Sequence, residues 1–139
     1  MALKGLESVK DLAILNAEDI DSIAENVVKN KQLNEIKTNQ IRNIFSSISK
    51  QRNEFKKVKH GNTEEDKKIL EKIKRDIILL KPILAYAAGR QNNVRDYQEF
   101  MKDVIDKTVN SEDLKSALEN FFLLSETVIA YHKFYGGKE

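Results

Sequence analysis

The chain has 139 residues, which is enough for one domain whose hydrophobic core folds without a disulfide or a bound metal. Forty per cent of its residues are hydrophobic and 33% are charged, and five glycines with one proline leave little material for turns, which indicates long helices. The absence of cysteine excludes thiol nucleophiles, zinc knuckles and disulfide frameworks. The longest apolar run, Ile83 to Ala88, is too short to span a bilayer, so we expect a cytoplasmic protein that is neither exported nor inserted into a membrane.

Charge is segregated along the chain. The segment from Lys37 to Arg95 contains fifteen Lys/Arg and six Asp/Glu, a net charge of +9. The segment before it contains four bases and seven acids, the segment after it five bases and nine acids, and these two flanks reduce the overall net charge to +2. Positive charge gathered in one stretch predicts an electrostatic footprint for a polyanion.

The first half of the chain predicts two helices. Asn16 is placed to cap a short helix that ends near Lys29, Asn30 and Lys31, with acidic residues in its first turn. Thr38 is the next candidate cap, and it precedes a long amphipathic helix that we expect to end at His60, Gly61 and Asn62. The apolar stripe of this second helix comprises Ile41, Ile44, Phe45, Ile48, Phe55 and Val58.

Thr63 is expected to cap a third helix. Ile78 and Leu79 add apolar surface on the side opposite its main stripe, so we expect the end of this helix to be buried on most faces. Pro82 predicts a break or kink, after which a short helical piece runs to a stop at Gly89.

Two further helices complete the pattern. Asn92 or Asn93 is expected to open the fourth, which ends near Asn110, and Ser111 is expected to cap the fifth, which ends at Gly136 and Gly137. No strand-length alternation occurs. The sequence therefore predicts an all-α, single-domain bundle of about five helices over residues 1–139, with a break or kink near Pro82.

The chain contains few groups suited to catalysis. His60 lies in a polar loop, where we expect a solvated side chain, and His132 lies on an apolar stripe, where we expect a hydrogen-bonded core residue. The acidic clusters at residues 64–66 and 112–113 directly follow predicted caps, so stabilisation of helix N-termini explains them. No nucleotide-binding glycine loop or serine-nucleophile motif is present. We predict no enzymatic activity, no cofactor and no metal site.

The basic residues differ in their predicted placement. Arg42, Lys50 and Lys56 fall beside or opposite the apolar stripe of the second helix, whereas Arg52 falls on the stripe and must snorkel, pair with an acid or reach a partner. In the third helix Glu71 and Asp76 interleave with the bases, which makes it the weaker binder. A solvated charged face without any ligand remains open as an alternative.

The aromatic residues mostly follow the helical core spacing, so no base-stacking platform is evident from the sequence. If the polyanion is a nucleic acid, contacts to its phosphates would dominate. Such contacts give affinity and salt dependence without sequence preference.

Three segments together resemble the small helical subunit of type III-A CRISPR (Csm) effector complexes. They are Lys37 to Phe45 (KTNQIRNIF), Leu80 to Arg90 (LKPILAYAAGR) and Ala130 to Gly137 (AYHKFYGG). The correspondence covers about residues 33–137, and residues 1–32 match loosely.

The resemblance implies a non-catalytic, RNA-binding building block of an antiviral, RNA-guided interference complex. Several stacked copies would lie beside the guide RNA and hold the target strand paired with it, while other subunits of the complex carry out the cutting. A subunit that serves any guide must bind the strand through its backbone, without reading its sequence.

The resemblance also nominates contact residues. Arg42, Lys81 and Arg90 align with the family pattern and are carried over as candidate RNA contacts. Charge and location alone add four more, Lys50, Arg52, Lys56 and Arg95. Relatives often carry a second basic residue where this chain has Ile83, so no contact is assigned there. The remaining motif residues are interpreted as core or subunit-contact residues, namely Tyr86, Tyr131, His132 and Phe134.

The acidic flanks suggest self-association, with the negative ends of one copy against the positive middle of the next and a homodimer as one form of the isolated chain. Two other functions stay open at this point. One is a helical protein–protein interaction bundle without nucleic-acid binding, and the other is a helix-turn-helix DNA binder, suggested by Thr38 to Arg42 at a helix start.

Overall fold

The computed structural model describes residues 6, 9–30 and 33–136. Its α-helices in chain order are α1 (Ala17–Asn30), α2 (Thr38–Phe55), α3 (Glu64–Ile78), α4 (Leu80–Arg90), α5 (Arg95–Val109) and α6 (Leu114–Phe134). The described ranges also contain three short 3-10 helices, η2 (Leu12–Ile14) before α1, η3 (Leu33–Glu35) between α1 and α2, and η4 (Asn92–Val94) between α4 and α5. No strand occurs in these described ranges, so the predicted all-α fold is confirmed.

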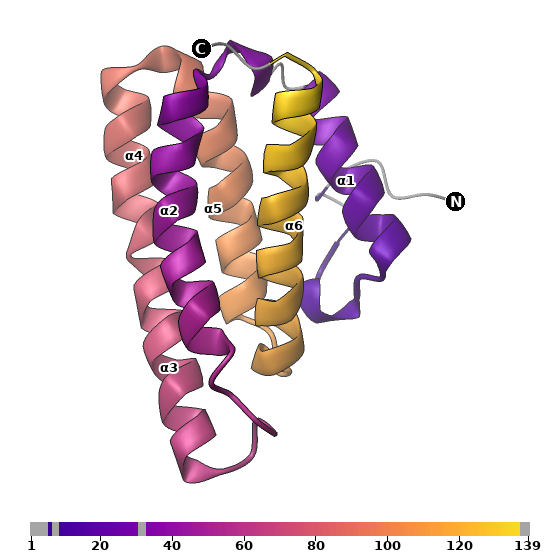
Figure 1. The fold of residues 1–139 in the computed structure, drawn as a ribbon, viewed down its shortest axis with the longest axis vertical. Coiled ribbons are helices and arrows are strands. Elements are labelled where there is room, and N and C mark those ends of the chain that lie inside the picture. Colours follow the sequence, from indigo (N-terminus) through magenta and orange to yellow (C-terminus); the bar gives the residue numbers. More distant parts are fainter. Residues whose placement is uncertain (1–5, 7–8, 31–32, 137–139) are drawn as a thin grey trace.

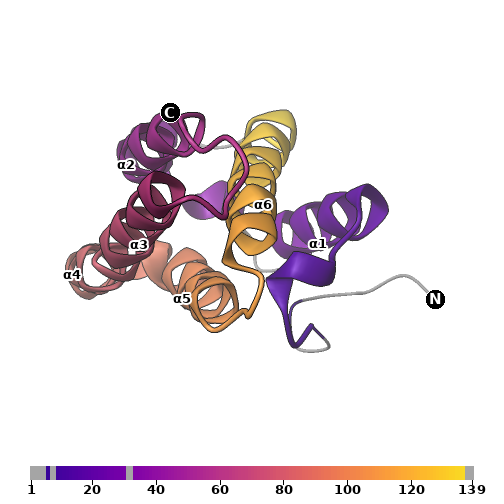
Figure 2. The same ribbon diagram turned by 90° about the horizontal axis from the view of Figure 1, so that it is seen from below.

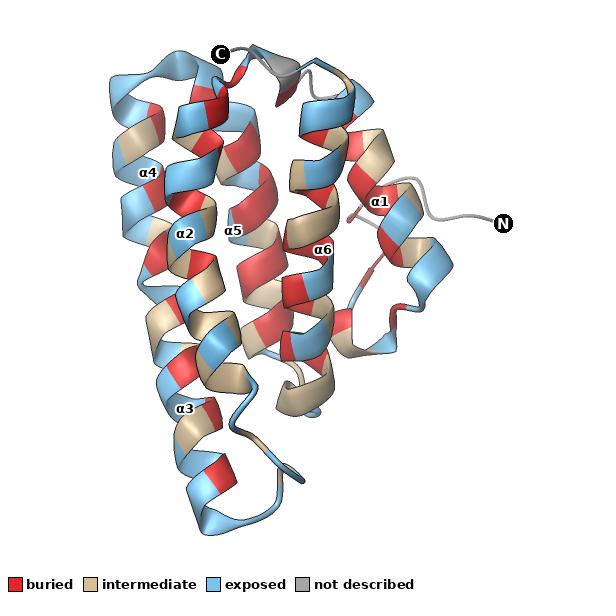
Figure 3. Cartoon of the chain, in the orientation of Figure 1, coloured by how far each residue is buried: buried red, intermediate tan, exposed pale blue. Residues whose placement is uncertain are grey.

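Figure 1 shows α3 and α4 following one another along one edge of the molecule, with α2, α5 and α6 beside them and α1 at the opposite edge. The view from below agrees, since α1 packs on α6 and lies far from α3 and α4 (Figure 2). Buried residues follow the inward side of each helix (Figure 3), and Ile23, Tyr97 and Phe121 are among the largest fully buried side chains. α3 and α4 together correspond to the one predicted helix with a break near Pro82. Counted in this way, the bundle agrees with the prediction of about five helices.

Two predicted caps are confirmed. The side chain of Asn16 accepts a hydrogen bond from the Asp19 backbone N–H at 2.8 Å, and the Asp19 carboxylate accepts one from the Asn16 N–H at 3.2 Å. At the start of α3, Thr63 Oγ1 accepts from the Asp66 N–H at 3.0 Å. These bonds satisfy N-terminal donors that have no acceptor within their own helix.

The predicted cap at Thr38 is wrong. Thr38 is the first residue of α2 and is buried, and its hydroxyl has no hydrogen-bond partner in the described part of the chain. Lys37 precedes the helix instead, and Gln40 Oε1 accepts from the Lys37 N–H at 2.8 Å. The helix therefore begins with a side chain turned into the core, which no local capping signal indicates.

α2 ends at Phe55, five residues before the predicted stop at His60. The buried carboxylate of Asp66 accepts hydrogen bonds from the backbone N–H groups of Lys59, His60 and Gly61, at 3.2, 2.9 and 2.9 Å. Gly61 adopts a φ of +90°, which favours glycine. The bond from His60, followed by that from Gly61, lowers the pKa of Asp66 to about 2. Asp66 thus closes the loop between α2 and α3, a role beyond the helix-end stabilisation that the sequence predicted.

The predicted break near Pro82 occurs at Leu79, which separates α3 from α4. Pro82 is the third residue of α4, in the first turn, where backbone N–H groups have no intrahelical acceptor. Proline is therefore tolerated inside the new helix. Gly89 does not end α4, which continues to Arg90.

The expectation that the end of the third helix is buried on most faces is wrong. Ile78 and Leu79 are 38% and 50% exposed, and Ile83 and Tyr86 on α4 are 53% and 67% exposed. The α3–α4 rod lies at an edge of the bundle, so only its inward side, which includes Ile77, meets the core. We call Ile78, Leu79, Ile83 and Tyr86 the outer apolar face.

The starts of α5 and α6 also differ from the predictions. η4 precedes α5, and Asn93 donates hydrogen bonds to the Glu35 carbonyl oxygen and to Gln40 Oε1, at 3.1 and 3.0 Å, instead of capping. α6 is capped by Asp113, whose Oδ1 accepts from the Ser116 N–H at 3.3 Å, rather than by Ser111.

The end of α6 and the two histidines match the predictions. Gly136 follows α6 with a φ of +79°, while Gly137 lies outside the described residues. His132 is 1% exposed and its Nε2 donates to the Ile36 carbonyl oxygen at 2.8 Å, which confirms a hydrogen-bonded core histidine. His60 is exposed in its loop, as predicted.

Candidate nucleic-acid interface

The fold divides the basic middle of the chain into three parts. Residues 37–63, which form α2 and the loop after it, contain seven Lys/Arg and one Asp/Glu, a net charge of +6. α3 contains five of each and is neutral, and residues 80–95 contain three bases and no acid. Most of the positive charge therefore belongs to α2 and its C-terminal loop, which agrees with the prediction that the third helix is the weaker binder.

One side of α2 carries exposed polar and basic residues. At about 100° per residue, these positions fall within a sector of about 100°, on the side away from the core. This α2 polar face comprises Asn39, Arg42, Asn43, Ser46, Lys50 and Asn53. It holds amides, a hydroxyl and two cations and no carboxylate, which are the groups that proteins use to contact phosphate and sugar.

Arg90 and Arg95 are exposed near the end of the bundle where α2 begins. The link is direct, because Gln40 in the first turn of α2 donates a hydrogen bond to Gln91, the residue after Arg90. The Arg90 guanidinium also lies 5.8 Å from the centroid of the Tyr86 ring. The fold thus brings Arg42, Arg90 and Arg95 to one end of the molecule.

Two of the predicted contact residues form ion pairs across helices. Arg52 pairs with Glu126 of α6, which settles the choice between snorkelling, pairing and reaching a partner in favour of pairing. Lys81 Nζ lies 2.6 Å from Asp106 Oδ1 of α5. Both cations are partly shielded and neutralised by these partners, so they are less available to a phosphate than Arg42, Lys50 and Lys56, which are exposed.

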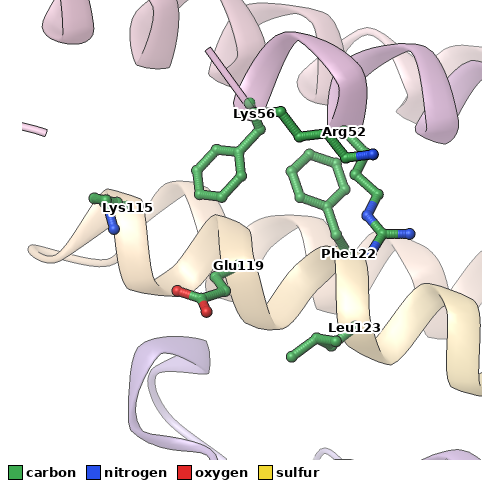
Figure 4. Close-up of a pocket in the computed structure, with 7 residues that line it drawn as sticks. Arg52, Lys56, Lys115, Glu119, Phe122 and Leu123 are labelled. Atoms are coloured by element: carbon green, nitrogen blue, oxygen red, sulfur yellow. The ribbon is translucent and has the colours of Figure 1, made fainter. Parts of the chain in front are cut away.

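A cavity of about 320 Å³ lies between the C-terminal end of α2 and the first half of α6. Figure 4 shows Arg52 extending from α2, Lys56 from the position directly after α2, and Lys115, Glu119, Phe122 and Leu123 from α6. Its lining residues are Arg52, Phe55, Lys56, Lys115, Glu119, Phe122 and Leu123. Sequence reasoning missed Lys115, because it follows the basic segment in the chain and lines the same cavity as Lys56 only through the packing of α6 on α2.

Comparison with known protein families matches residues 15–138 to the family described as Csm2 Type III-A. The chain belongs to the Csm2 family. The resemblance predicted from the three segments is therefore confirmed, and the chain is a subunit of a type III-A CRISPR effector complex. No curated protein and no solved structure matches the chain.

The Csm2 match includes every α-helix, from α1 to α6, so the α2 polar face, the outer apolar face and the cavity all lie inside the matched range. Csm2 is a family of structural subunits, which makes the other subunits of the effector complex the partners of this chain. The helix-turn-helix alternative loses its support with this assignment.

The described residues contain neither a metal-binding cluster nor a membrane-spanning helix. No group of three or more His, Asp or Glu among them is placed to hold a metal ion. None of the helices in the described ranges is long and apolar enough to cross a membrane.

Proposed function

We propose that this Csm2 subunit holds the target RNA strand, paired with the guide RNA, through phosphate contacts from the α2 polar face. The main support for this proposal is the charge distribution, because residues 37–63 have a net charge of +6 whereas α3 is neutral. In addition, the α2 polar face has exposed hydrogen-bond donors and no carboxylate. Phosphate contacts position a strand without reading its bases, so this mode of binding, which we call the RNA grip, works with a guide RNA of any sequence.

The contact residues have different weights in this proposal. Arg42, Lys50 and Lys56 are the primary contacts, since they are exposed on or directly after α2. Arg90 and Arg95 would add further phosphate contacts at the end of the bundle where α2 begins. Arg52 and Lys81 contribute less, because Glu126 and Asp106 already pair with them. Lys115 is added to the candidate contacts because it lines the same cavity as Lys56.

In this proposal the subunit is a non-catalytic cytoplasmic protein without a cofactor. Its two histidines have structural explanations, one in a core hydrogen bond to Ile36 and one in an exposed loop. The buried Asp66, which has a strongly lowered pKa, serves the loop before α3. Membership of a family of structural subunits supports the same reading.

The subunit is further proposed to stack in several copies. α1 contains four acids and one lysine, a net charge of −3, while the α3–α4 edge carries the outer apolar face followed by Arg90. The two surfaces lie on opposite edges of the bundle (Figures 1 and 2), so one copy can present α4 to α1 of the next. A head-to-tail contact of this kind can repeat from copy to copy and so build a row of subunits. For the isolated chain, the first product of this association would be a homodimer.

The binding experiment compares two variants with equal charge changes. Arg42→Glu/Lys50→Glu/Lys56→Glu alters α2 and its C-terminal loop, and Lys67→Glu/Lys68→Glu/Lys72→Glu alters exposed positions of α3. Each is titrated with two single-stranded RNAs of unrelated sequence and with duplex DNA, as the isolated chain and within the assembled complex, because stacked copies raise the affinity for one strand.

The proposal expects equal affinity for the two RNAs, a loss of at least tenfold in the α2 variant and a small change in the α3 variant. If the wild type binds no RNA in either form, the function is that of a protein–protein interaction bundle. Equal losses in both variants would indicate general charge attraction without a defined face.

A further inference from the structure

The cavity between α2 and α6 combines apolar walls with cations at its edge (Figure 4). The rings of Phe55 and Phe122 pack with their centroids 5.4 Å apart, and Phe122 is 3% exposed. Leu123, which is 42% exposed, stands at the edge of the same space. A volume of about 320 Å³ is at the small end of the range for ligand pockets, which suits one flat ring system.

Lys56, which directly follows α2, and Lys115 of α6 line this cavity from two distant segments of the chain. Within the described part of the chain neither lysine forms an ion pair, whereas Arg52 pairs with Glu126. The two lysines are therefore available to bind an anion at the mouth of the cavity.

The loop closed by Asp66 confines the stem of Lys115. A Cβ atom added at Gly61 would lie 2.8 Å from Lys115 Cδ, so the lysine packs directly against the backbone of this loop. Three hydrogen bonds to the Asp66 carboxylate hold the loop in place. The position of Lys115 beside the cavity is thus set by the fold, which reduces the entropy that binding would cost.

We propose that the cavity receives one unpaired nucleobase of an RNA strand whose phosphates run along α2, with Lys56 and Lys115 at the adjoining phosphates. Glu119 at the cavity provides acceptors for the N–H groups of the base. A nucleotide joins a flat apolar ring to an anion, which matches apolar walls beside two cations. A free anion would find no donors on the walls formed by Phe122 and Leu123, and an apolar protein side chain would leave both lysines unused.

This inference rests on the proposed RNA grip and extends it, since Lys56 belongs to both. It also refines an expectation from the sequence. Phe55 and Phe122 do follow the core spacing, as predicted, but the space beside them comes from the crossing of α2 and α6 and has no sequence signature.

The test separates bases from phosphates. Wild-type protein is titrated with a single-stranded RNA and with an oligomer of equal length that has the same sugar–phosphate backbone and no bases. The proposal expects about tenfold tighter binding of the RNA, which corresponds to stacking of one base. A 2-aminopurine reporter in the RNA should change its fluorescence on binding.

Leu123→Glu places a carboxylate at the cavity, and Ala130→Glu makes the same charge change at an exposed position farther along α6. We expect Leu123→Glu to lose the preference for bases. It should still bind the abasic oligomer in a salt-dependent manner, with a modest loss from the carboxylate placed near Lys56 and Lys115. Ala130→Glu should keep both properties. Phe122 is left intact because it is buried and its truncation would strongly destabilise the fold.

Equal affinity of the wild type for RNA and the abasic oligomer would overturn the base site and leave the phosphate grip intact. Failure of both oligomers to bind would instead overturn the proposed function. A Leu123→Glu variant that assembles poorly with the other subunits, yet still prefers bases, would assign the cavity to a protein partner.

Discussion

Arg52 at the end of α2 forms an ion pair with Glu126 of α6, with the two side chains 40% and 30% exposed. The pair explains why a cation lies on the apolar stripe of its helix, since the charged group leaves the core to meet a carboxylate on a neighbouring helix. It also separates Arg52 from the other candidate contacts. Substitution of Arg52 would change the packing of α2 on α6 as well as any RNA contact.

A double-mutant cycle of Arg52→Gln and Glu126→Gln tests this structural role. Because both side chains are partly exposed, we expect a coupling free energy below about 1 kcal/mol in urea unfolding. RNA affinity should fall less than in Lys50→Gln, a matched loss of one charge at an exposed position. A larger loss for Arg52→Gln than for Lys50→Gln, with no change in stability, would make Arg52 a direct contact.

The outer apolar face predicts the outcome of a self-association experiment. Leu79→Glu/Ile83→Glu removes exposed apolar surface and adds charge that repels the acidic α1 of another copy. We expect weaker association in analytical ultracentrifugation, and a free energy of unfolding within about 0.5 kcal/mol of the wild type, because both positions face outward. The control Asn62→Glu/Asn110→Glu adds the same charge elsewhere and should associate normally. Equal association of all three proteins would place the contact on another surface.

Acid stability should depend on Asp66. Its pKa is lowered from 3.8 to about 2, so its carboxylate contributes stability that is fully present above pH 3.8 and is lost as the pH falls towards 2. Asp66→Asn should therefore be less stable than the wild type at pH 6, with the difference shrinking between pH 4 and 2 in urea unfolding. A difference that stays constant over this range would show that charge has no part in holding the loop.

Tyr97 carries a buried hydroxyl without a hydrogen-bond partner among the described residues, and burial raises its pKa. Tyr97→Phe removes that unpaired group, so we expect the free energy of unfolding to stay equal or to rise by about 1 kcal/mol. Tyr131→Phe is the control, because the Tyr131 hydroxyl donates to Asp21 at 2.5 Å and its loss should lower stability slightly. Destabilisation by Tyr97→Phe would reveal a partner for its hydroxyl.

Local chemistry made part of the fold predictable. The caps at Asn16 and Thr63 depend on residues within one turn, and His132 was recognised from its place on an apolar stripe. Thr38 failed as a cap because its side chain turns into the core, which depends on tertiary packing. The end of α2 was misplaced because Asp66, from the next helix, organises the loop.

Surface exposure was harder to predict than helix position. The apolar residues Ile78 and Leu79 have the same pattern whether their own chain or another protein covers them, so burial was the default expectation. In the candidate site, Arg42 and Lys50 were placed correctly on the outer side of their helix, because both follow from helical periodicity. The ion pair of Arg52 with Glu126 joins distant segments, and so does the cavity that Lys56 and Lys115 both line, so no local pattern contains either feature.

The most direct test of the RNA grip is the salt dependence of single-stranded RNA binding by the wild type and by Arg42→Glu/Lys50→Glu/Lys56→Glu. Each phosphate contact to a single strand contributes about −0.7 to the slope of log K against log salt concentration. The proposed contacts predict a steep slope for the wild type and a slope shallower by about 2 for the variant. Equal slopes for the two proteins, or no binding by the wild type at low salt even in the assembled complex, would contradict the grip.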